Sequence, residues 1–252
     1  MTDKSKIVTA AMIVIGNEIL SGRTRDSNMH HVATRLTELG VRLTEARFIP
    51  DDEAVIVATV NELRARHDYV FTSGGIGPTH DDITADAIAR AFGVGIDIDP
   101  RARAILEAHY EPGMLNEARL RMARIPIGAA LIDNPVSKAP GFRLENVYVM
   151  AGVPSIMQAM FESIRHELVG GAPLLSRTVA ARVAEGAIAA DLAAIQNAHE
   201  GVEIGSYPFF RGGIPGTSIV LRSTDQAALD RAAEAYVAVL ARQGITPIET
   251  PA

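Results

Sequence analysis

Cysteine is absent from this 252-residue sequence, and aromatic residues make up only 5% of it. Without cysteine there can be no disulfide framework, thiolate zinc site, iron–sulfur cluster or cysteine nucleophile. The formal net charge is -6, and no dense run of lysine and arginine occurs. Together with the shortage of aromatic residues for stacking, this argues against a nucleic-acid-binding surface.

Long apolar runs are also missing. None approaches the roughly 18 residues needed to span a bilayer, so we expect no membrane association. The polar segment Met1–Lys6 leads directly into a strand-like stretch, which does not fit a signal peptide and predicts a cytoplasmic protein. The chain does contain 48% hydrophobic and 21% charged residues. This balance supports a folded core and excludes disordered and low-complexity classes.

The first hundred residues alternate between apolar, strand-like runs and amphipathic helical stretches. Strands are predicted over 7–15, 41–49 and 69–72, and helices are predicted to begin near 28, 53 and 82–84. This alternation predicts right-handed βαβ units and a parallel sheet covered by helices on both faces. In such sheets, ligands bind beyond the carboxyl ends of the strands. Three loops leave those ends, and we expect the chemistry there: residues 16–26, 50–53 and 73–84.

A different order begins after the Gly- and Pro-containing segment 169–173, which is the clearest linker in the sequence. The order predicted beyond it is strand (177–183), helix (186–198), strand (202–207), strand (217–222), helix (226–243) and strand (245–248). This βαββαβ order is typical of a small ferredoxin-like α+β domain. We therefore expect a main domain over 1–172 and a second domain over 173–252.

The strongest local signal is the segment 72–84, TSGGIGPTHDDIT. Glycines at a strand end let the backbone approach a ligand closely, and successive N–H groups beside a helix N-terminus favour a phosphate or pyrophosphate. The alternative is a tight loop in which Asp82 or Thr84 only caps the helix. The segment is not a P-loop, because no Gly-Lys-Ser/Thr closes it. It is not a dinucleotide fingerprint either, because His80 stands where the third glycine would be.

Carboxylates gather at two of the three loops, as the pairs Asp51–Asp52 and Asp81–Asp82. Mg²⁺ is usually held by one or two carboxylates plus substrate phosphates, so these acids suffice for a metal–phosphate site. Since adjacent residues in an extended segment point opposite ways, we expect one member of each pair to be a cap. Glu18 and Asp26 on the first loop are further candidates. His80 has two possible roles: it could act as an acid–base group or phosphate contact, or it could be a solvated loop residue.

The motifs resemble those of the competence/damage-inducible CinA-type N-terminal region, which belongs to the MoaB/Mog molybdopterin-binding superfamily. The resemblance covers residues 7 to about 168 and continues more loosely through the second domain. It rests on Ile15–Gly22, Asp26–Asn28, Pro50–Asp52, Gly74–Thr84, Asn134–Pro135, Ala139–Phe142 and Ala151–Pro154.

The resemblance implies a three-layer αβα fold with a mostly parallel sheet, whose pocket binds molybdopterin or a nucleotide, with Mg²⁺ or another divalent metal. It also implies oligomers, which are common in the family. The resemblance places the catalytic and metal-holding carboxylates at Asp82 and Asp51, with Glu18 as a further metal ligand. The ligand-binding residues that it implies are Ser73, Gly74, Gly75, Gly77, Thr84, Gly152 and Pro154.

Two departures from the family pattern matter. Asn17 replaces the aspartate of the usual Gly-Asp-Glu, which removes a charge that could hold metal, and Ala151 replaces the first proline of Pro-Gly-x-Pro. The amidase domain of longer CinA proteins has no counterpart here. Relatives imply two activities: metal-dependent hydrolysis of a pyrophosphate such as ADP-ribose or FAD, and adenylyl transfer to molybdopterin. A non-catalytic carrier is a third possibility. Because no second nucleotide motif is present, hydrolysis is favoured if there is catalysis.

Overall fold

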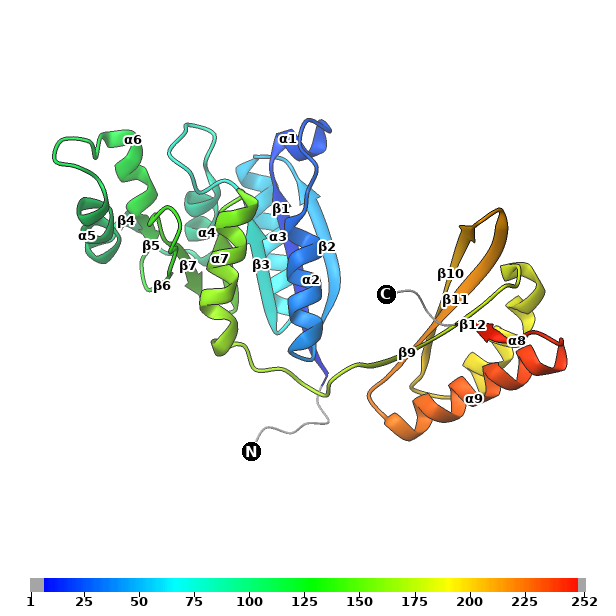
Figure 1. Ribbon diagram of the computed structural model, residues 1–252. Helices are drawn as coiled ribbons and strands as arrows, with labels where there is room; N and C mark the ends of the chain where they lie inside the picture. The colour runs from blue at the N-terminus through cyan, green and yellow to red at the C-terminus, as the bar shows by residue number, and fades with distance from the viewer. Residues whose placement is uncertain (1–6, 249–252) are drawn as a thin grey trace. The chain divides into compact units, whose positions relative to one another are not determined.

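The computed structural model describes residues 7–248 (Figure 1). The chain forms two compact units that meet in sequence between Ala172 and Pro173. Between residues 7 and 248, no helix combines the length and the apolar character that a bilayer crossing requires.

A six-stranded sheet organises the first unit. In spatial order its strands are β2 (Val41–Ile49), β1 (Val8–Ile15), β3 (Tyr69–Ser73), β8 (Val147–Met150), β7 (Gly141–Leu144) and β6 (Ala130–Ile132). The first four run parallel, and β7 is antiparallel to both of its neighbours. The mostly parallel sheet expected from the sequence is thus confirmed.

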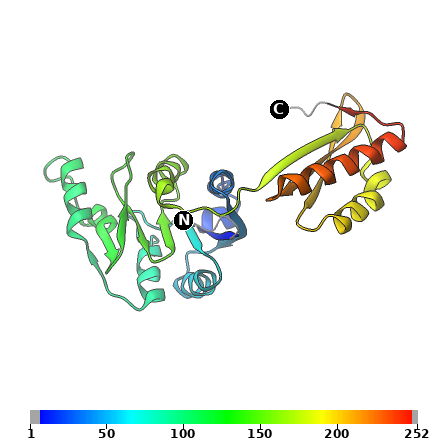
Figure 2. The same ribbon diagram turned by 90° about the horizontal axis from the view of Figure 1, so that it is seen from below.

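Both faces of this sheet are buried. Side chains of a strand alternate between the two faces, so nearly every residue of β1 is apolar. Its residues Ala11, Ile13 and Ile15 join one core, while Ala10, Met12 and Val14 join the other. One face is covered by α2 (Asn28–Glu38) and α7 (Pro154–Ile164), and the opposite face by α3 (Glu53–Arg66), α4 (Thr84–Phe92) and α5 (Pro100–His109) (Figure 2).

Helix ends follow their local sequences. Asp52 caps α3 by accepting a hydrogen bond from the Val55 N–H, and Asp99 caps α5, whose first residue is Pro100. Gly93 ends α4 in the left-handed conformation, with φ of 65°. These ends fix where the loops between strands and helices begin.

Several short elements were not predicted. The loop at 16–26 contains a helical turn, α1 (Asn17–Leu20), because Ile19 packs against the core under α2. A two-stranded ribbon pairs β4 (Ile96–Ile98) with β5 (Arg124–Pro126), and the 3-10 turn Arg121–Ala123 leads into β5. Such short segments carry too little periodicity to be recognised in the sequence. The two helices expected on either side of Pro112-Gly113 are present, and the second of them, α6, is short (Glu117–Leu120).

The second unit consists of one antiparallel sheet and two helices. The elements along the chain are β9 (Leu175–Ala181), α8 (Glu185–Ala198), β10 (Glu203–Arg211), β11 (Ile214–Ser223), α9 (Gln226–Arg242) and β12 (Pro247–Ile248). The strand order β10-β11-β9-β12 is that of the ferredoxin-like fold, as expected. Residues of both helices and of β9 and β11 form its core, including Ile219, Tyr236 and Leu240.

Candidate functional site

A cavity of about 470 Å³ opens at the carboxyl ends of β1, β3 and β8. This volume lies in the range of small-molecule pockets. Its lining includes the 74–78 loop and the polar residues Glu18, Thr24, Asp51, Asp81, Asp82, Asn134 and Ser137. The remaining lining residues are Gly152 and the apolar Ile15, Met122, Ala139, Ala151, Val153, Pro154 and Ile156.

The Gly-rich loop can be built only from glycine at two consecutive positions. Gly74 and Gly75 have φ of 112° and 70°, and a Cβ on Gly74 would lie 2.1 Å from the Ile15 carbonyl oxygen. The Gly74 N–H donates to the Met150 carbonyl, so it is committed to the fold. The N–H groups of Gly75, Ile76 and Gly77 have no acceptor within residues 7–248 and are free for a ligand.

Thr84 ties this loop to the start of α4. Its hydroxyl donates to the Gly74 carbonyl (3.0 Å) and its N–H to the Gly75 carbonyl (2.9 Å). The side chain is fully buried and does not line the cavity. No side chain caps α4, so the alternative in which Asp82 or Thr84 serves as the helix cap is wrong.

Asn28 joins three segments beneath the cavity. Its Nδ2 donates to the Ser73 Oγ and to the Gly152 carbonyl, both at 2.7 Å, and the Ser73 hydroxyl donates to the Ala151 carbonyl. The Asn28 Oδ1 is buried and has no partner among the described residues. Ser73 faces a smaller side cavity rather than the main one, so its contacts hold the ends of β3 and β8 together.

The two carboxylate pairs behave differently. Of the first pair, Asp51 lines the cavity and accepts from the Asn17 N–H (2.8 Å), while Asp52 is the cap of α3, as predicted for one member. Both Asp81 and Asp82 line the cavity.

Asp82 accepts from both the N–H and the hydroxyl of Thr79, which closes the turn before α4. For Asp81, the Thr79 hydroxyl, the backbone and His80 lower the pKa of the carboxyl against a small desolvation effect. Asp81 is therefore ionised at neutral pH.

Among residues 7–248, four carboxylates thus line the cavity, and no lysine, arginine or histidine does. His80 is exposed outside it. Within the described part of the chain, no three histidine, aspartate or glutamate side chains are grouped to hold a metal ion. An ion here would consequently need oxygen atoms from a ligand as well as from the protein.

The structure therefore brings most of the sequence-derived residues to one cavity: Glu18, Asp51, Gly74, Gly75, Gly77, Asp82, Gly152 and Pro154. Ser73 and Thr84 lie outside its lining. Sequence reasoning missed the lining residues Met122, Asn134 and Ser137. Asn134 had a recognisable signal, since an Asn-Pro loop follows an apolar run, whereas Met122 had none.

Two parts of the chain match known families. Residues 11–170 match the family described as "Probable molybdopterin binding domain", and residues 173–249 match "FAD synthase, middle domain". A CinA-like protein of Citrifermentans bemidjiense is 40% identical over 167 residues, which cover 64% of this chain and 40% of that protein. A protein of Archaeoglobus fulgidus is 36% identical over 197 residues, which cover 78% of this chain and 84% of that protein.

Among solved structures, the protein CinA of unknown function from Thermoplasma acidophilum superposes with a TM-score of 0.61 at 33% identity. The superposition covers 64% of this chain and 98% of that one. The match to the C. bemidjiense protein, by contrast, spans well under half of that protein's length.

Proposed function

The chain belongs to the family of probable molybdopterin-binding domains, and from this premise we propose that its large cavity binds a phosphorylated pterin or adenine nucleotide. One observation carries the proposal: three successive residues, Gly75 to Gly77, line the cavity, and their N–H groups have no acceptor among residues 7–248. Backbone N–H groups in this arrangement bind anionic oxygens.

The lining residues suit both parts of such a ligand. The Gly-rich loop and the carboxylates would hold a phosphate and its counter-ion. Val153, Pro154 and Ile156 offer apolar surface for a flat heterocyclic ring, and Val153 is 55% exposed.

Asp51 and Asp82, with Glu18 as a further donor, would hold a divalent metal together with phosphate oxygens. When bound, such an ion neutralises charge on the phosphates and can activate water. The donor chemistry fits Mg²⁺, which is usually held by one or two carboxylates plus phosphate. Since no three-carboxylate group exists among the described residues, we expect metal and ligand to bind together and the metal alone to bind weakly.

For catalysis we propose hydrolysis of a nucleotide pyrophosphate of the ADP-ribose or FAD type. The concentration of carboxylates around a phosphate cradle supports this over simple storage of a ligand. The match of residues 173–249 to a domain of FAD synthase is a further reason to test FAD.

The deciding experiment measures AMP release from ADP-ribose and FAD with Mg²⁺, Mn²⁺ or Co²⁺. It compares the wild type with Asp82→Asn, Asp51→Asn and the matched control Asp52→Asn, which changes the neighbouring helix cap outside the cavity. We expect metal-dependent release that Asp82→Asn and Asp51→Asn abolish, while Asp52→Asn keeps it because asparagine is an equally good cap.

Other outcomes would point to the alternatives. Tight binding of molybdopterin or a nucleotide without AMP release would identify a carrier. Transfer of AMP to molybdopterin in the presence of ATP would identify an adenylyltransferase. If neither pterins nor nucleotides bind, or if Gly75→Val leaves the affinity of a ligand that does bind unchanged, the cavity is not the site.

A further inference from the structure

The side chains that line the proposed binding cavity carry negative charge, which opposes the binding of a phosphorylated ligand. The lining of this cavity includes Glu18, Asp51, Asp81 and Asp82 but no lysine, arginine or histidine from residues 7–248. Carboxylates that line the same cavity as a bound phosphate repel it, and the repulsion is stronger in a partly enclosed site than in open water. Positive charge must therefore come from a bound metal, from an arginine beside the cavity, or from both.

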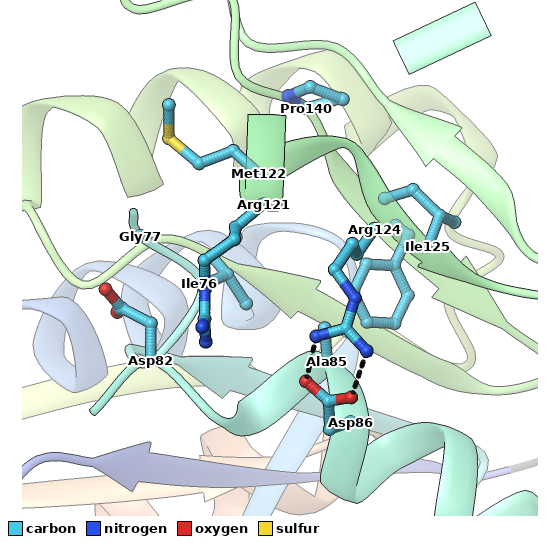
Figure 3. A pocket seen from close by; sticks show the side chains of 11 residues that line it. Ile76, Gly77, Asp82, Ala85, Asp86, Arg121, Met122, Arg124, Ile125 and Pro140 are labelled. Atoms are coloured by element: carbon cyan, nitrogen blue, oxygen red, sulfur yellow. Dashed lines mark hydrogen bonds and ion pairs between the residues drawn. The ribbon is translucent and has the colours of Figure 1, made fainter. Parts of the chain in front are cut away.

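Arg121 lies where such a charge is needed. A second, smaller cavity adjoins the main one, and Ile76, Gly77, Asp82 and Met122 line both. Arg121 lines only the smaller cavity, at the start of the 3-10 turn Arg121–Ala123. In Figure 3 the Arg121 side chain extends into this space, and its guanidinium lies between Asp82 and the Arg124–Asp86 pair.

The two arginines of this turn differ in what they already bind. Arg124 forms a two-pronged ion pair with Asp86, with Nη1–Oδ2 and Nη2–Oδ1 distances of 2.9 and 2.6 Å (Figure 3). Its charge is therefore committed to the fold. The Arg121 side chain has no hydrogen bond or ion pair with any residue from 7 to 248, and it is exposed, so it can rotate toward a ligand.

We propose that Arg121 binds the second phosphoryl group of the ligand and thereby selects compounds with two phosphoryl groups over monophosphates. This inference rests on the proposed function, since it assumes that the Gly-rich loop holds a phosphate. The N–H groups of Gly75 to Gly77 would bind one phosphoryl group, and Arg121 lines the adjoining cavity together with Gly77. The planar fork of a guanidinium matches two phosphate oxygens at once. The ligand class is thus a nucleoside or pterin diphosphate, free or within a longer pyrophosphate.

A second arginine provides the sharpest comparison. Arg25 lines a side cavity that shares Ile15, Glu18, Thr24, Gly152 and Pro154 with the main one but includes none of residues 74–78. It is also exposed, but it faces the first loop rather than the Gly-rich loop. Replacing either arginine by glutamine removes one positive charge near the cavity, and only the change at Arg121 should affect the second phosphoryl group.

The experiment is calorimetric titration of ADP and AMP, in EDTA and again with Mg²⁺, on the full chain. It uses the wild type, Arg121→Gln, Arg121→Lys, Arg25→Gln and Arg103→Gln, the last of which changes an exposed arginine paired with Glu107 on α5. A thermal melt of each variant checks that the fold is intact.

We expect the wild type to prefer ADP, and Arg121→Gln to weaken ADP binding about tenfold or more in EDTA while changing AMP binding less than about threefold. Arg121→Lys should keep part of the preference, because it retains the charge without the fork. Arg103→Gln and Arg25→Gln should leave the ratio of the two affinities unchanged.

An unchanged ratio in Arg121→Gln, or a loss of preference in Arg25→Gln alone, would overturn the role of Arg121 while leaving the proposed function standing. If the wild type binds neither nucleotide under either condition, the role of Arg121 is overturned, and the proposed function then stands only if a phosphorylated pterin binds.

Discussion

The two units use their loops in opposite ways. In residues 7–172, the carboxyl ends of parallel strands converge, so loops separated by more than a hundred residues meet at one edge, as Asn28 and Gly152 do. In residues 173–248, an antiparallel sheet sends alternate connections to opposite edges. There the β10–β11 hairpin projects Phe210, which is 72% exposed, away from any enclosed site in its unit.

The difference lies in how much strain and polarity each unit carries at its loops. The first unit holds Gly74 against the Ile15 carbonyl and Gly75 against the Thr84 side chain, both with positive φ. It also has a buried asparagine whose oxygen has no partner among the described residues, and four carboxylates around one cavity. The glycines of the second unit's hairpin, Gly212 and Gly213, also have positive φ, but a Cβ on either would meet nothing within 4 Å. Constraint of this kind is typical of a functional site rather than of a simple turn.

The largest expected effect comes from matched glycine substitutions. Gly74→Ala should destabilise the first unit by about 2–5 kcal/mol, from the left-handed conformation and the forced displacement of the Ile15 carbonyl. Gly213→Ala should cost the second unit only about 1–2 kcal/mol, since it meets open space. Hydrogen exchange read by mass spectrometry reports each unit separately. Equal losses would show that the Gly-rich loop is no more constrained than the hairpin.

The next comparison is between two side-chain amides, Asn28 and Gln196, each of which forms hydrogen bonds to residues outside its own helix but within its own unit. Asn28→Ala removes two hydrogen bonds that connect α2 with Ser73 and Gly152. It should lower the stability of the first unit by about 2 kcal/mol and also weaken ligand binding. Gln196→Ala removes a similar bridge in the second unit, to the Val202 carbonyl and the Ile204 N–H. We expect it to lower stability there without changing nucleotide binding in a titration. Loss of binding in Gln196→Ala would extend the site beyond the first unit.

The first unit should also respond to mild acid. Burial and the charge of Arg35 lower the pKa of His31, against the opposing charges of Glu162 and Glu38. A lowered pKa in the folded state means that the unfolded chain takes up the proton first. Stability is therefore complete above about pH 6.5 and falls, by about 1 kcal/mol at most, as the pH drops below that value. In urea titrations at pH 7.5 and 5.5, His31→Gln should lose this part of the pH dependence; an identical dependence in both proteins would contradict it.

The smallest effect is expected in the core of the second unit. The Tyr236 hydroxyl is buried without a hydrogen-bond partner in the described residues, and burial raises the pKa of Tyr236 to about 12. Tyr236→Phe should stabilise this unit by about 0.5–1 kcal/mol, because an unpaired polar group leaves the core. The wild type should lose stability between about pH 10 and 12, and the variant should lose less. Thermal melts at pH 7 and 10.5 test both points, and destabilisation at pH 7 would reveal a partner for the hydroxyl.

Much of the fold could be predicted because its signals are local. The apolar run of β1, the caps at Asp52 and Asp99 and the left-handed Gly93 each act within a few residues. The Gly-rich loop was recognisable for the same reason, since only glycine accepts its backbone angles. The αβα and ferredoxin-like arrangements followed from the order of these elements.

The site needed information from distant parts of the chain. Nothing in the sequence near Arg121 or Met122 marks them as neighbours of Asp82, because a 40-residue excursion through α5 and α6 returns them to the Gly-rich loop. Likewise, Asn28 reads as the start of a helix, and only the tertiary structure places its amide between Ser73 and Gly152.

The sequence by itself therefore determined the elements, their order and the loop that can approach an anion, since backbone angles and burial patterns are written in neighbouring residues. Only the tertiary structure shows which carboxylates share a cavity and that the buried Thr84 hydroxyl donates to the Gly-rich loop. It also shows that Arg124 is paired with Asp86, whereas Arg121 has no partner among residues 7–248. These outcomes depend on distances between segments, which are set by packing on both faces of the sheet.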